Sequence, residues 1–124
     1  MIPGPLGLRW RERLLPRMEN GEIACYDPPT RYRVRRWLDL APAIADDIFV
    51  KLHTHGAQER NAATLLDGGL EQMFSWMSEE CTRLGYQLNF ASAWDMRQAV
   101  EIARGCPPLT TDHPLLQPPI ALRQ

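Results

Sequence analysis

The sequence predicts an α/β fold centred on a parallel strand–helix–strand–helix unit. The run Ile48–Leu52 is short, apolar and contains β-branched and aromatic residues, which is typical of a strand buried on both faces. Apolar residues then recur at helical spacing as far as Leu84, and a second short run, Tyr86–Ala91, alternates in polarity. A strand, a helix and a second strand in this order form a right-handed crossover between parallel strands.

Proline marks the limits of the organised region. Six of the eleven prolines fall within the first 42 residues and five within the last 18. Because proline interrupts helices and strands, we expect residues 43–105 to be the best-organised part of one domain that spans residues 1–105. Residues 106–124 form a proline-rich tail.

The N-terminal segment before this unit is predicted to be extended chain and turns. Asn20-Gly21 is a common tight-turn pair within the first 29 residues. Thr30 is placed to cap a helix that ends at Pro42. The apolar positions of that helix repeat at i, i+3, i+4 and i+7, as Val34, Trp37, Leu38 and Ala41.

The helices of the central unit carry their own start and stop signals. Residues 57–65 are expected to form a loop or a short helical turn, and Asp67 is placed to cap the following helix. Gly85 fits the position just after that helix. Ser92 then caps the last helix, with Asp95 three residues on as a variant of the capping box. The apolar stripe of the longer helix is Leu66, Leu70, Met73, Met77, Cys81 and Leu84.

Two parallel strands do not close a sheet. An open edge leaves backbone N–H and C=O groups unpaired, so at least one more strand is needed. We expect that strand to come from residues 6–26, from the tail or from another chain.

Composition argues against several classes of function. The chain has a net charge of −1. Eight of its fourteen basic residues lie in the first 36 positions, where four acidic residues reduce the excess to +4. Nucleic-acid-binding domains carry a stronger basic bias, so a solvated face is favoured and no nucleic-acid partner is predicted.

The three cysteines, Cys25, Cys81 and Cys106, are far apart and lack C-x-x-C spacing, which argues against a disulfide framework or a structural zinc site. The sequence shows no signal peptide and no apolar run long enough to span a membrane. We therefore expect a cytoplasmic chain with no membrane partner.

The turn at the end of the first predicted strand carries the candidate chemistry. Lys51, His53 and His55 alternate along one side of the strand end, and Gly56 allows a sharp turn after them. In open parallel sheets and barrels, ligands bind at the carboxyl ends of strands. Imidazole titrates near neutral pH and serves as acid, base or metal ligand. A hydrogen-bonded structural histidine pair is the alternative.

The stretch from Phe49 to Glu59 resembles the C-terminal region of polysaccharide-deacetylase-like proteins with the NodB homology domain. The helix 69–85, the end of the second strand with Ala93-Trp94-Asp95-Met96, and Glu19-Asn20-Gly21 are also similar to that region, so the resemblance covers about residues 2–105. It implies a partial (β/α) barrel-like unit.

The late motif of that family has the form Leu-x-x-His, matched here from Leu52 to His55. The resemblance therefore implies that His55 is the general acid of an N-acetyl sugar deacetylase, with His53 in a supporting role. Lys51, Glu19 and Asn20 are the candidate substrate-binding residues, and a carbohydrate is the implied partner.

The chain also departs from the family pattern. A complete member holds a divalent metal, zinc, with an aspartate and two histidines from early motifs, and uses an early aspartate as base. No Thr-Phe-Asp-Asp segment and no His-x-x-x-His spacing occurs here. We therefore expect no metal site in this chain and no deacetylase activity from the chain alone.

Three interpretations remain open at this point. The chain is the C-terminal part of a deacetylase-like protein whose N-terminal half is missing, and it is inactive alone. Alternatively, it is a non-catalytic α/β module for binding or oligomerisation. The third is a metal-dependent hydrolase built by a homo-oligomer, in which His53 and His55 of two chains meet at an interface.

Overall fold

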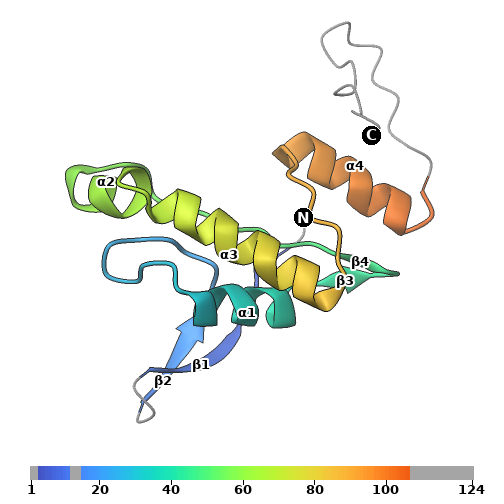
Figure 1. The fold of residues 1–124 in the computed structure, drawn as a ribbon. Helices are drawn as coiled ribbons and strands as arrows, with labels where there is room; N and C mark the ends of the chain where they lie inside the picture. The colour runs from blue at the N-terminus through green and yellow to red at the C-terminus, as the bar shows by residue number, and fades with distance from the viewer. Residues whose placement is uncertain (1–2, 12–14, 107–124) are drawn as a thin grey trace, which may run out of the picture.

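The computed structural model describes residues 3–11 and 15–106 and contains two small sheets and four helices within those ranges (Figure 1). Proline-rich residues 107–124 lie outside the described residues, and so do the predictions made for them. The elements in chain order are β1 (Gly7–Arg11), β2 (Leu15–Glu19), α1 (Arg31–Leu40), β3 (Ala43–Ile44), β4 (Asp47–Ile48), α2 (Glu59–Leu66), α3 (Gly69–Leu84) and α4 (Ala93–Ala103).

The fold is mixed α/β, but the predicted parallel strand pair is wrong. β1 pairs with β2 and β3 pairs with β4, both antiparallel. The predicted strands, residues 48–52 and 86–91, do not pair with each other, and Ile48 pairs with Ala43 of β3 instead. The backbone of the first run bonds elsewhere, because Phe49 donates to Pro42 O at 2.9 Å and His53 donates to Gly21 O at 3.1 Å.

The N-terminal segment is more regular than the extended chain that we expected. β1 and β2 form an antiparallel hairpin in which Leu8 faces Met18 and Arg9 faces Arg17. Arg9 is buried while Leu8 and Met18 are exposed. The inner face of this hairpin is therefore charged and its outer face is apolar, the reverse of the usual arrangement, which local periodicity does not reveal.

The helix signals were mostly correct. Thr30 caps α1 by accepting from Arg33 N, and Gly85 follows α3 with a φ of 77°. Ser92 and Asp95 form a reciprocal capping box at α4. The prediction for Asp67 is wrong, because that residue ends α2 and donates its N–H to Ala63 O. The preceding loop was underestimated, since most of it forms a regular two-turn helix.

The hydrophobic core lies where α1 packs on α3 (Figure 1). Trp37 is fully buried at its centre, and the predicted stripe of α3 meets it. The buried members of the core are Ile23, Val34, Trp37, Leu38, Leu65, Met73, Met77 and Cys81. The predicted inner face of α1 is confirmed at Val34, Trp37 and Leu38, and that of α3 at Met73, Met77 and Cys81. The two ends of the predicted stripe are wrong, because Leu84 is exposed and Leu66 is an exposed residue of α2.

A buried carboxylate joins the hairpin to this core. Glu19 ends β2 with no exposed surface, and Arg33 of α1 donates to its two oxygens at 3.0 and 2.7 Å. The indole of Trp37 donates to the same carboxylate at 2.8 Å. Charged side chains are almost never fully buried unless they are paired in this way.

A second acidic side chain, Glu80 of α3, is also fully buried. The guanidinium groups of Arg31, Arg35 and Arg83 each donate to its carboxylate through Nε. We name these four residues the Glu80 cluster. These hydrogen bonds join α1 to the C-terminal part of α3.

Within the described ranges, no helix combines the length and apolar character needed to cross a membrane.

The Glu80 cluster predicts how stability responds to acid. Hydrogen bonds from Arg83 and Arg31 outweigh burial and, with Arg35, lower the pKa of Glu80 from 4.5 to about 2. A carboxyl whose pKa is lower in the folded state stabilises the protein above its unfolded pKa and loses that contribution as pH falls through the folded value. The free energy of unfolding should therefore fall between pH 4.5 and about 2.

Glu80→Gln should flatten that decline, measured by urea unfolding across the acid range. Glu79→Gln is the matched control, because Glu79 is the exposed neighbour that pairs with Arg31. Its curve should run parallel to that of the unchanged protein. Identical slopes for all three proteins would contradict the role given to Glu80.

Candidate functional site

A glycine turn brings two distant segments of the chain together. Gly21 has a φ of +74°, and a Cβ atom there would lie 3.0 Å from Lys51 O. This freedom lets the chain after β2 run parallel to residues near His53. The backbone N–H of His53 donates to Gly21 O at 3.1 Å, and the backbone carbonyl of His53 accepts from Ile23 N at 2.9 Å.

Four side chains gather where these segments meet, and we name Glu22, Tyr26, His53 and His55 the histidine cluster. His55 Nε2 lies 3.7 Å from Glu22 Oε1. The Tyr26 hydroxyl donates to the same oxygen. The two imidazole rings lie edge to face with their centroids 5.9 Å apart. The predicted pair therefore stands beside a carboxylate and a phenol.

The cluster is open to solvent. The side chain of His55 is 75% exposed, whereas that of Glu22 is 15% exposed. The hydrogen bond from Tyr26 outweighs the effect of partial burial and, with the nearby His55, lowers the pKa of Glu22. The same hydrogen bond raises the pKa of Tyr26. At neutral pH the cluster therefore presents an ionised carboxylate to an accessible imidazole.

Asn61 of α2 holds the two loops of the cluster. Its side chain is buried, accepts from Cys25 N at 3.0 Å and donates to Gly56 O at 3.3 Å. Gly56 has a φ of 91°, as the predicted sharp turn requires. Sequence reasoning missed Asn61 because residues 57–65 carried no apolar periodicity strong enough to indicate a helix.

The remaining predicted site residues fall in different surroundings. Asn20 is exposed, and its Oδ1 accepts from Glu22 N at 3.0 Å. Lys51 is also exposed but borders a different hollow, together with Pro3 and Arg97. Glu19 lies in the core instead, with both carboxylate oxygens bonded to Arg33. Sequence reasoning did not select Glu22 or Tyr26, because only the distant pairing with residue 53 brings them to the histidines.

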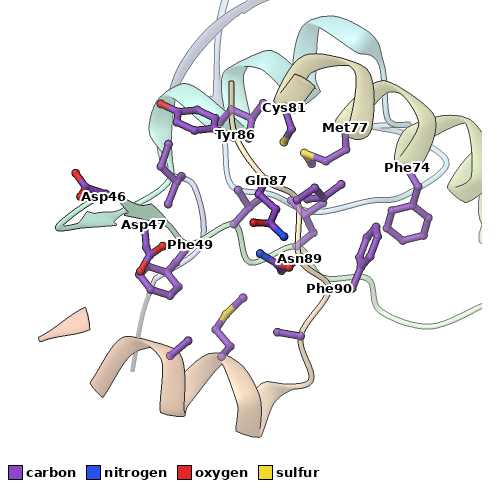
Figure 2. Close-up of a pocket in the computed structure, with 18 of the residues that line it drawn as sticks. Asp46, Asp47, Phe49, Phe74, Met77, Cys81, Tyr86, Gln87, Asn89 and Phe90 are labelled. Carbon is purple, nitrogen blue, oxygen red and sulfur yellow. The ribbon is translucent and has the colours of Figure 1, made fainter. Parts of the chain in front are cut away.

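A separate apolar cavity of about 560 Å³ lies between α3, α4 and the chain around Phe49 (Figure 2). Figure 2 shows the amides of Gln87 and Asn89 directed into it. Phe74 and Phe90 meet edge to face at its side, with ring centroids 5.3 Å apart. Val50 and Leu52 also line this cavity, whereas the histidines do not.

The described residues do not fit a catalytic zinc site. Three protein ligands are usual for catalytic zinc. Among residues 3–11 and 15–106, no three His, Cys, Asp or Glu side chains come together as such a site requires.

The chain matches no known protein family, no curated protein sequence and no solved structure.

Tyr26→Phe tests the electrostatics of the histidine cluster. Removing the hydroxyl removes the strongest influence that lowers the pKa of Glu22, so that pKa should rise. The measurement is a carbon NMR titration of the Glu22 carboxyl group. Tyr32→Phe, which alters an exposed tyrosine of α1, is the control and should leave the titration unchanged. An unmoved midpoint in Tyr26→Phe would refute the contact.

Proposed function

We propose that this chain forms one part of a polysaccharide-deacetylase-like active site, the part that donates a proton to an N-acetylated carbohydrate substrate. The observation that carries the proposal is the accessible imidazole of His55 beside the ionised Glu22, with Nε2 and Oε1 3.7 Å apart. Histidine is the side chain best suited to donate a proton near neutral pH. The resemblance of residues 49–59 to that family supports the same role.

The cluster supplies one part of the reaction. Glu22 favours an N–H on the nearer imidazole nitrogen, which leaves the Nδ1 edge of His55 to face a substrate. The protonated ring donates to the amine nitrogen as the C–N bond of the acetamide breaks. The attack of water on the acetyl carbon requires a base and an electrophile, which we assign to a second polypeptide.

The same second polypeptide would complete the sheet. Residues 49–55 make one isolated bridge, and residues 86–91 form no strand within the described chain. Both runs have strand-like sequences. We infer that they become strands of a (β/α) barrel-like sheet when a partner half supplies the neighbouring strands. The isolated chain is therefore inactive as a hydrolase.

Carbohydrate contacts would come from the rim of the cluster. Asn20 is exposed beside Glu22, and Lys51 is exposed two residues before His53, so they offer a side-chain amide and an ammonium group. Both groups hydrogen-bond hydroxyls and carbonyls of sugars. Because its carboxylate is already bonded in the core, Glu19 contributes by supporting the turn at Asn20 rather than by touching a sugar.

A non-catalytic module for binding or oligomerisation is the second candidate. The cavity beside Phe49 favours it, because its apolar lining is open and its size suits a bound side chain or small ligand. In that case the histidine cluster has a structural role, and the cavity binds the ligand or the partner.

An NMR titration of the chain with tetra-N-acetylchitotetraose separates the two candidates. We expect shifts of the amide and imidazole signals of His53 and His55, with smaller shifts for cellotetraose, which has the same linkage without acetamido groups. His55→Ala should weaken binding several-fold, and Gln72→Ala, which changes an exposed residue of α3, is the control.

Two outcomes would count against the proposal. Shifts confined to the cavity lined by Phe49 and Phe90 would support the binding module instead. Release of acetate by the chain alone with added zinc, abolished in His55→Ala, would show that one polypeptide suffices and contradict the need for a second half. We expect no acetate release.

A further inference from the structure

The Glu80 cluster holds three guanidinium groups around one carboxylate. Arg31 and Arg35 lie one turn apart on α1, and Arg83 lies near the end of α3. Their Nε atoms donate to Glu80 at 3.0, 2.9 and 2.7 Å. The carboxylate of Glu80, which has no exposed surface, thereby restricts the positions of the three arginine side chains.

The Nη groups of two of these arginines, Arg35 and Arg83, make no hydrogen bond to the described residues. Arg31 bonds to Glu79 as well as to Glu80. Arg35 and Arg83 make no other hydrogen bond among residues 3–11 and 15–106, and their side chains are 51% and 57% exposed. Within that part of the chain, their Nη groups therefore have no hydrogen-bond acceptor and are available to bind a ligand.

The charges of the cluster do not balance. Three guanidinium groups are opposed by the carboxylates of Glu79 and Glu80, which leaves one positive charge. The low pKa of Glu80 keeps that residue ionised, so the arrangement persists across the neutral range. An excess positive charge on fixed, half-exposed donors attracts anions.

We propose that the Nη groups of Arg35 and Arg83 form a binding site for a tetrahedral oxyanion, a phosphate or sulfate group. Guanidinium groups bind such anions through paired N–H donors in a fixed fork. Because Glu80 already restricts both side chains, less conformational entropy is lost on binding than with free surface arginines. This site lies on α1 and α3 and is independent of the histidine cluster and of the function proposed for it.

The test follows the arginine Nε–Hε signals in two-dimensional NMR while inorganic phosphate is added at constant ionic strength. We expect saturable shifts for Arg35 and Arg83. Arg35→Gln and Arg83→Gln should each weaken phosphate binding about threefold to fivefold, the factor expected for one exposed charged contact. Arg60→Gln, which changes an exposed arginine of α2, is the matched control and should bind as the unchanged chain does.

Parallel titrations with sulfate and with glucose 6-phosphate distinguish a free anion from a phosphorylated sugar. Tighter binding of the ester than of inorganic phosphate would identify a phosphorylated ligand, and equal binding would identify the free anion. Shifts that rise linearly for every exposed arginine, or equal affinities in the Arg35→Gln and Arg60→Gln proteins, would overturn the proposal. Melting curves confirm that each variant is folded before it is titrated.

Discussion

The buried carboxylate of Glu19 is the constraint on which the rest of the structure depends. Arg33, Trp37 and the backbone N–H of Gly21 all donate to it. Leaving such a charge buried without partners costs several kcal/mol, on the order of 3–5. The hairpin, the turn that follows it and α1 must therefore keep one mutual arrangement as long as the chain is folded.

Arg33 extends this constraint to the loop that carries the histidine cluster. Its guanidinium also donates to the carbonyl oxygens of Glu22, Asp27 and Pro28. Arg9 pairs with the Asp27 carboxylate from the hairpin side. The loop between β2 and α1 is thus held at both ends by buried charge, which explains how Glu22 keeps its place beside exposed His55. A site formed by loops needs such support to keep its geometry.

Sequence reasoning predicted the parts of this structure that depend on local chemistry. The caps at Thr30 and Ser92 and the middle of the apolar face of α3 follow from the local sequence, and these were confirmed. The prediction of a strand at residues 48–52 was wrong because a strand-like sequence forms a strand only when a partner strand is available. In this chain the available partner is the turn after Gly21.

The candidate site likewise contains some residues that the local sequence indicates and others that it does not. His53 and His55 stood out because histidines beside a glycine turn have a recognisable chemical role. Glu22 and Tyr26 did not, since their proximity depends on a contact about thirty residues away in sequence. Glu19 was named as a candidate substrate-binding residue because its buried ion pair with Arg33 is not indicated by the sequence around either residue.

A double-mutant cycle on Glu19 and Arg33, measured by urea unfolding, tests the central claim most directly. The single variants Glu19→Gln and Arg33→Met each remove one hydrogen-bonded partner of a buried charge, while Arg9 stays beside Glu19 and Asp27 stays beside Arg33. Each should therefore lose about 3 kcal/mol of unfolding free energy. The double variant should recover part of that loss, giving a coupling energy of about 1–3 kcal/mol. Losses that add to within about 0.5 kcal/mol would show that the two charges act independently and would contradict this account.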